Sequence, residues 1–100
     1  MSVVVHIATE VIAPEVARRK ANGWLLDQVG NLLIGQNPEL VAGDAMVWRV
    51  TVVLTSPARG HVGTLGTVDV DAATGDVLAD EAVILALQKQ ARYVSKLAQG

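Results

Sequence analysis

The sequence predicts one α+β domain over residues 1–100, in which an antiparallel sheet packs on one long helix and an added C-terminal helix closes the chain. Three observations predict this class. Apolar and polar residues alternate in two neighbouring segments, 46–55 and 61–71, and turn-forming residues separate them. Helical spacing of apolar residues begins after Pro14 and again after Asp80. A chain of this length can also fold without metals or disulfides.

The first part of the chain is predicted to be a strand followed by the long helix. Val3–Ile12 is rich in β-branched residues, and alternate positions share one apolar face. Pro14 suits the first position of a helix, where its missing N–H costs nothing. The apolar spacing that follows predicts a helix from Pro14 to Ile34, with Gly23 and Gly30 inside it.

Three further strands are predicted after a loop. Gly35–Ala45 contains Gly, Asn, Pro and Asp, which favour a loop. Met46–Thr55 is the clearest strand, and a turn at 56–60 leads into a second strand at His61–Asp71. A short strand at Val77–Ala79 completes the sheet. The predicted order is therefore β-α-β-β-β-α.

The chain is predicted to end in a second helix capped by Asp80. Its apolar stripe consists of Ile84, Leu87, Ala91, Val94 and Ala98, broadened by Val83 and Leu85. Two arrangements are open for this stripe. It covers the sheet's second face, which is only partly apolar, or the helix and that face are buried against a second copy in a homodimer.

A resemblance follows from the two central strands. The segment VWRVTV at 47–52 follows a helix, and the next strand ends in the turn DAATGDV at 71–77. Over roughly residues 16–78 this resembles PepSY-like domains and, more loosely, the cystatin-like arrangement of a helix wrapped by an antiparallel sheet. In the turn, Asp71 is expected to accept backbone hydrogen bonds, Thr74 to do so more weakly, and Gly75 to supply a left-handed conformation. The motif thus marks a fold rather than an active site.

The resemblance implies a non-enzymatic module that binds or restrains peptidases, and it transfers no functional residue. The added strand at the start and the closing helix are departures from that pattern. The chain's small size also fits a toxin-neutralising or immunity-type role.

Composition limits the partners. The net charge of −2 gives no general attraction for nucleic acid or anionic lipid. Arg18, Arg19 and Lys20, even with Arg49 and Arg59, lack interleaved aromatic residues and are interpreted as a solvated helix face. The first residues are too polar and too short for a signal peptide or a membrane span. We therefore expect a cytoplasmic protein with no nucleic-acid and no membrane partner.

Four aspartates suggest calcium, but their spacing does not fit: Asp69, Asp71, Asp76 and Asp80. An EF-hand loop needs an oxygen ligand at position 5, glycine at 6 and glutamate at 12. Counted from Asp69, these positions hold Ala73, Thr74 and Asp80. We interpret the aspartates as turn residues and a helix cap.

Other candidates for chemistry are equally weak. His6 and His61 lie on separate predicted strands without metal-ligand spacing. No cysteine is present, which excludes disulfides and cysteine nucleophiles. No nucleophile motif surrounds Ser2, Ser56 or Ser95. No lysine and helix follow Gly60, Gly63 and Gly66, as a phosphate loop requires. No catalytic, cofactor-binding or metal-binding residue is assigned, and no cofactor is expected.

The sequence therefore favours a non-enzymatic protein-interaction or regulatory module that binds another protein through a sheet edge or the terminal helix. One alternative is a small-ligand domain with a cavity of roughly 300 Å³ or more between helix and sheet, lined by Trp24 or Trp48. The other is an enzyme that uses His6 or His61. The simpler prediction for the tryptophans is that they pack together between helix and sheet.

Overall fold

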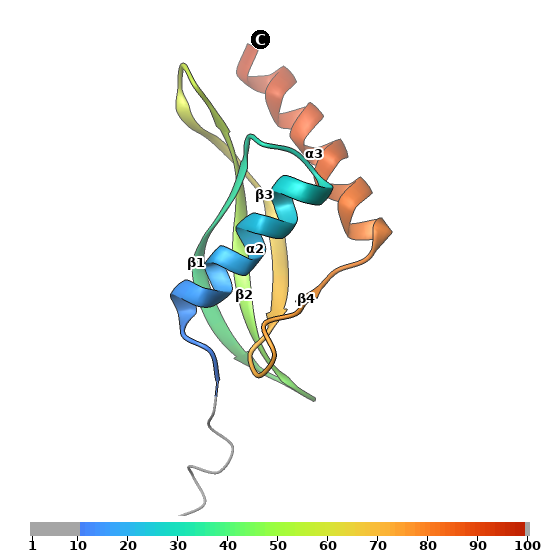
Figure 1. The fold of residues 1–100 in the computed structure, drawn as a ribbon. Coiled ribbons are helices and arrows are strands. Elements are labelled where there is room, and N and C mark those ends of the chain that lie inside the picture. Colours follow the sequence, from blue (N-terminus) through green and yellow to red (C-terminus); the bar gives the residue numbers. More distant parts are fainter. Residues whose placement is uncertain (1–10, 100) are drawn as a thin grey trace, which may run out of the picture.

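A computed structural model describes residues 11–99, and its fold is α+β (Figure 1). Within this part of the chain, helix α2 (Pro14–Gln28) precedes four strands, and helix α3 (Glu81–Gln99) ends the chain. The strands are β1 (Leu33–Ala42), β2 (Met46–Ser56), β3 (Gly60–Asp71) and β4 (Val77–Leu78). They form one antiparallel sheet in the order β1-β2-β3-β4. Helix α2 lies across the sheet and α3 runs along β3 (Figure 1).

One face of the sheet, here called the inner face, forms the core with α2. The buried side chains of this core are Ala17, Ala21, Leu25, Leu33, Val50, Val52, Leu54, Val68, Val70 and Leu87. Two alanines on α2 allow the helix to approach β1 closely. A Cβ atom on Gly35 would lie 2.7 Å from Cγ1 of Val50 and 3.5 Å from Cβ of Ala21. Only glycine therefore fits in β1 where α2 crosses it.

Helix α3 covers the other half of the inner face. A Cβ atom on Gly63 would lie 2.7 Å from Cγ1 of Val94, and one on Gly66 would lie 3.7 Å from Cδ2 of Leu87. Both glycines pair with inner-face residues of β2. The opposite face of the sheet, here called the outer face, is the second face named in the sequence analysis. The arrangement in which the closing helix covers that face is therefore wrong.

The hairpin of β2 and β3 curls because its register shifts twice, between Val52 and Val53 and between Leu54 and Thr55. The extra residues lie in the glycine-containing half of β3. Glycines within a strand often mark such bulges or close approaches. Bending here lets a single face receive both helices.

The turn after β3 has the predicted chemistry. Asp71 Oδ1 accepts hydrogen bonds from the N–H groups of Ala73 (2.8 Å) and Thr74 (3.0 Å). Thr74 Oγ1 accepts one from Asp76 (3.1 Å), and Gly75 has a φ of 84°. The N–H of Thr74, followed by that of Ala73, holds the pKa of the Asp71 carboxyl below its usual value. The turn thus fixes how β3 leads into β4.

Helix α2 is shorter than predicted, and a strand replaces the predicted loop. The N–H groups of Val29 and Gly30 both donate to the Leu25 carbonyl at 2.9 Å, which ends the helix at Gln28 rather than at Ile34. Strand β1 then uses the last predicted helical residues together with most of Gly35–Ala45. The described order is α-β-β-β-β-α, so the predicted β-α-β-β-β-α order is wrong.

The predicted strand Val3–Ile12 falls outside the described residues up to position 10, and Val11 and Ile12 are not in a strand. At the other end, Asp80 caps α3 as predicted, because its Oδ1 accepts the Val83 N–H at 3.2 Å. Leu85, predicted to broaden the buried stripe, is instead 61% exposed.

Candidate functional site

The residues singled out for chemistry are dispersed. His6 and Ser2 fall outside the described residues, and His61 is exposed on β3. Asp71 holds a turn and Asp80 caps a helix. Within residues 11–99, no three His, Cys, Asp or Glu side chains are placed to hold a metal ion.

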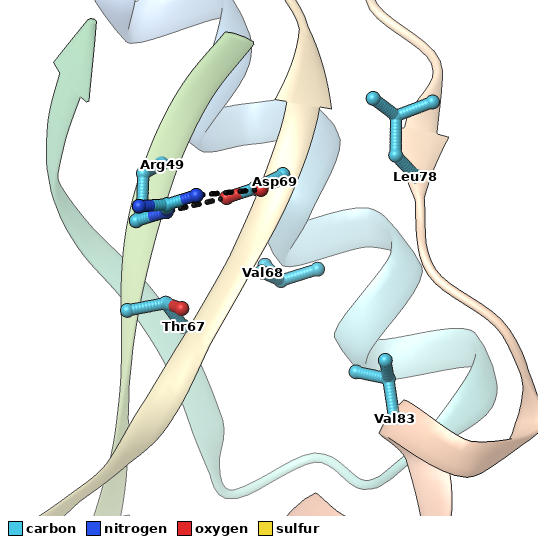
Figure 2. A pocket seen from close by; sticks show the side chains of 6 residues that line it. All are labelled: Arg49, Thr67, Val68, Asp69, Leu78 and Val83. Carbon is cyan, nitrogen blue, oxygen red and sulfur yellow. Dashed lines mark hydrogen bonds and ion pairs between the residues drawn. The ribbon is translucent and has the colours of Figure 1, made fainter. Parts of the chain in front are cut away.

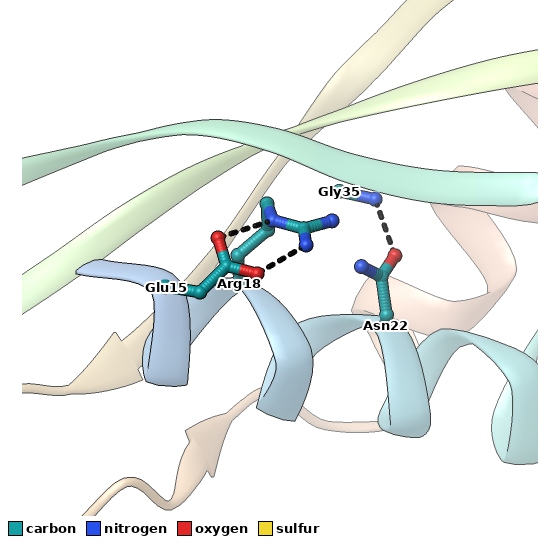
Figure 3. A network of polar contacts seen from close by, with 4 residues as sticks. All are labelled: Glu15, Arg18, Asn22 and Gly35. Atoms are coloured by element: carbon teal, nitrogen blue, oxygen red, sulfur yellow. Dashed lines mark hydrogen bonds and ion pairs between the residues drawn. The ribbon is translucent and has the colours of Figure 1, made fainter. Parts of the chain in front are cut away.

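The basic residues do not form one patch either. Arg18 forms an ion pair with Glu15 on α2 (Figure 3), and this hydrogen bond to Arg18 lowers the pKa of Glu15. Arg49 pairs with Asp69 on the outer face of the sheet. Arg59 donates from Nη1 to the carbonyl of Ala98 at 2.7 Å, which joins the β2–β3 turn to the end of α3.

Trp24 and Trp48 are both half-buried against the core. The indole N–H of Trp48 donates to the Ile12 carbonyl at 2.9 Å, so this ring anchors the chain before α2. Between α2 and the sheet, buried aliphatic side chains and the contact at Gly35 fill the space. Neither tryptophan lines any of the hollows described below.

The edge of the sheet formed by β1 is blocked at two points, and Figure 3 shows the first of them. Asn22 on α2 accepts the Gly35 N–H through Oδ1 at 2.7 Å, so this N–H is not available to another strand. Further along β1, the register shifts between Gln36 and Glu39. Asn37 there has a φ of 52°, and Pro38 has no N–H to donate.

The opposite edge, formed by β3, is mostly open. β4 pairs only with Asp69 and Val70. The Asp71 N–H donates towards the β4 side, to the Asp76 carbonyl at 2.8 Å. In an antiparallel strand, the backbone N–H and C=O groups of every second residue point to the same side. The backbone groups of Thr67 therefore point to the same side as those of Asp71, at a position beyond the last residue of β4. Among the described strands, none pairs with this side of β3 from Gly60 to Val68.

A groove of about 440 Å³ adjoins this open edge (Figure 2). Its lining residues are Arg49, Thr67, Val68, Asp69, Leu78 and Val83. Figure 2 shows the Arg49 and Asp69 side chains side by side over β2 and β3, while Leu78 comes from the end of β4 and Val83 from the first turn of α3. The groove thus has one polar side and one apolar side.

The polar side is held by a two-point contact. Arg49 Nε lies 3.0 Å from Asp69 Oδ1, and Nη2 lies 3.2 Å from Oδ2. The hydrogen bond to Asp69 is the main reason that the pKa of Arg49 is raised. The apolar side is accessible, since Leu78 is 49% exposed. The carboxylate in the groove, Asp69, is thus held by Arg49, and the two walls differ in polarity, which suits an extended segment whose side chains alternate.

Helix α3 has a second accessible surface. Leu85, Tyr93 and Leu97 are 61%, 57% and 63% exposed, and a hollow of about 490 Å³ lies over Ala86, Lys89, Gln90 and Tyr93. Sequence reasoning did not identify Tyr93 or Leu97. Their spacing from Ala86 and Gln90 along the helix was the available signal.

Neither helix between residues 11 and 99 is long and apolar enough to cross a membrane. No protein-family model, no curated protein and no solved structure matches this chain. Its function is therefore inferred from the two accessible surfaces.

Proposed function

We propose that this chain is a non-enzymatic protein-interaction module that binds an extended segment of another protein along the open edge of β3. The observation that carries the proposal is that β4 pairs with only two residues of β3, beside a groove that four elements line. An unpaired strand edge offers backbone donors and acceptors at fixed spacing. An extended peptide is the ligand that can pair with this edge and also place side chains in the groove.

The partner segment would continue the line of β4. Beyond Leu78 the chain turns away into α3, and the next outward-pointing position on β3 is Thr67. A segment hydrogen-bonded there would place alternate side chains in the groove. Apolar side chains would meet Leu78 and Val83, and polar ones would meet Arg49 and Asp69.

A regulatory role, such as restraint of a peptidase or a toxin, belongs to the same proposal. It is supported by the resemblance of the Asp71–Asp76 turn, and of the helix across the sheet, to PepSY-like domains. Strand addition at a sheet edge gives affinity through the main chain and specificity through side-chain pockets. The groove beside Thr67 provides such a pocket.

The proposal is tested with extended peptides selected for binding from a random displayed library. Two variants disrupt the site: Thr67→Pro removes the outward N–H, and Leu78→Glu places charge on the apolar wall. We expect each to weaken binding by about tenfold or more, equivalent to about 1.4 kcal/mol. On peptide binding, hydrogen exchange at the Thr67 amide should slow.

The matched control is Leu26→Glu, which changes a side chain that is 62% exposed on α2. It should bind the selected peptides as the unsubstituted chain does. If Thr67→Pro disturbs folding, as judged from its thermal unfolding, Leu78→Glu decides the test alone. Selected peptides that bind all three variants equally, or that leave exchange at Thr67 unchanged, would contradict strand addition.

A further inference from the structure

Helix α3 carries a row of residues with coiled-coil spacing, of which Ala86, Tyr93 and Leu97 are exposed, whereas Val83 and Gln90 are half-buried. The row is Val83, Ala86, Gln90, Tyr93 and Leu97, with steps of three, four, three and four residues. Such steps place side chains along a seam that faces a second helix, at positions a and d of a heptad repeat. In this register, Val83, Gln90 and Leu97 are a positions, and Ala86 and Tyr93 are d positions.

The hollow on α3 coincides with one repeat of this seam. It is lined by Ala86, Lys89, Gln90 and Tyr93, which occupy successive d, g, a and d positions. In a coiled coil, four residues so spaced form the hole that receives one side chain from the facing helix. The helix is thus shaped to receive a second helix, and Tyr93 and Leu97 are more than half exposed where that helix would lie.

The charges beside the seam are all positive. Lys89 and Lys96 occupy its g flank, with Arg92 one step further round, and all three are exposed. The ion pairs between residues 11 and 99 join α2 residues to each other and β2 to β3, so none involves this flank. The acidic residue of α3, Glu81, lies in the first turn.

The opposite flank is unavailable to a partner. Its e positions are Leu87 and Val94, which pack on Gly66 and Gly63 of β3. A facing helix therefore meets the seam and the lysine flank alone.

We propose that α3 binds an acidic amphipathic helix of another protein in a short two-helix contact. Carboxylates on the partner would pair with Lys89 and Lys96, while its apolar side chains would fill the hole at Ala86 and cover Tyr93 and Leu97. The contact goes beyond strand addition at β3 and does not require it: Thr67 and Leu78 take no part, and Val83, which also lines the groove, is only the first position of the seam.

A second copy of this chain fits the seam less well. Two antiparallel helices place their g flanks against each other, which would set lysine against lysine. Two parallel helices place g against e, and β3 already covers the e positions. Charge complementarity therefore selects a partner of opposite charge.

The test uses the full chain and two labelled helical peptides of three heptads. Both carry leucine at a and d, and they differ only in having glutamate or lysine at every e and g position. We expect the glutamate peptide to bind at least about tenfold more tightly at low salt, and the difference to shrink at 0.5 M salt. Fluorescence anisotropy measures both affinities.

Two sets of variants locate the contact. Tyr93→Ala with Leu97→Ala should weaken binding of the glutamate peptide by about tenfold or more. Lys89→Glu with Lys96→Glu should reverse the preference between the two peptides. Lys89 and Lys96 lie at the rim of the seam, and Tyr93 and Leu97 lie on it. All four side chains are exposed, so circular dichroism should show an unchanged fold.

Matched controls separate this proposal from strand addition. Leu26→Ala and Thr67→Pro should leave binding of the glutamate peptide unchanged, whereas Thr67→Pro should weaken binding of extended peptides by about tenfold or more. Equal binding of both peptides, or no binding of the glutamate peptide, would overturn the inference. So would self-association that Tyr93→Ala abolishes, since a second copy would then cover the seam. Binding to vesicles of mixed phosphatidylcholine and phosphatidylserine, without binding to the peptide, would overturn it in favour of a membrane surface.

Discussion

The two edges of the sheet differ in how the rest of the chain treats them. At β1, Asn22 occupies one outward N–H and a bulge at Asn37 and Pro38 interrupts the strand. At β3, strand β4 pairs with two residues, and no other strand between residues 11 and 99 pairs with the outward edge from Gly60 to Val68. Open edges promote association with other chains, and proteins usually close them. The edge that is blocked at two points is thus the less accessible one, and the other is the edge that we propose for binding.

The helices explain why the edges differ. α2 crosses β1 at Gly35, close enough for Asn22 to reach the edge. α3 lies on the face of β3, where Val94 and Leu87 meet glycines, and it makes no hydrogen bond to the outward groups of Thr67 among the described contacts. In this fold, α2 blocks the β1 edge at Gly35 because the polar side chain of Asn22 reaches it.

The largest expected effect concerns the contact that brings α2 to β1. Gly35→Ala puts a Cβ atom 2.7 Å from a methyl of Val50, which is fully buried and has no free space to move into. We expect the free energy of unfolding to fall by about 1–3 kcal/mol. Denaturant unfolding measures this loss.

The control for that substitution is Gly23→Ala. Gly23 lies on the exposed side of α2, and a Cβ atom there would meet nothing within 4 Å. Alanine should stabilise the helix by roughly 0.5–1 kcal/mol. If both substitutions were equally tolerated, α2 would not pack on β1 as described, and the closed edge would lose its explanation.

A smaller effect is expected from opening the β1 edge. Asn22→Ala removes the acceptor of the Gly35 N–H and should cost about 1 kcal/mol. Pro38→Ala restores an N–H to the edge. The double variant should self-associate more than the unsubstituted chain in sedimentation velocity, because both barriers to strand pairing are gone.

Asn22→Asp is the control, since it keeps an oxygen that accepts the Gly35 N–H. It should keep the association state of the unsubstituted chain. A double variant that associates no more than this control would show that α2, rather than these two residues, closes the edge.

The parts of this fold that follow from short-range patterns were predictable. The strands at 46–55 and 61–71, the Asp71 turn and the Asp80 cap each depend on residues within a few positions of one another. The short last strand was also predictable, because the turn before it and the cap after it leave little room. The open edge of β3 follows from that shortness.

Strand β1 was not predictable in the same way. Leu32, Leu33 and Ile34 continue the helical spacing of α2, and only the bonds to the Leu25 carbonyl end the helix earlier. Asn37 and Pro38 have the composition of a loop, yet an edge strand accommodates both in a bulge. Which side of α3 is exposed depends on where Gly63 and Gly66 receive it, and that contact is not local in sequence.

The smallest expected effect concerns the turn that sets where β4 begins. Backbone N–H groups of Thr74 and Ala73 lower the pKa of Asp71 from an ordinary value of 3.8. A carboxyl whose pKa is lower in the folded state stabilises the fold above its unfolded pKa, and this contribution is lost as the pH falls through the folded pKa. Acidification below about pH 4 should therefore loosen the turn and lengthen the open edge of β3.

The measurement is an NMR titration of the Ala73 and Thr74 amides, together with their hydrogen exchange. Their shifts should have a midpoint below 3.8, and exchange at both amides should quicken as the carboxyl is protonated. Asp71→Asn keeps an oxygen acceptor and removes the ionisable group, so the same amides should lose this pH dependence while the turn persists. A midpoint at or above 3.8 would mean that the carboxylate does not hold the turn, and the boundary between paired and open β3 would then depend on Thr74 and Gly75 alone.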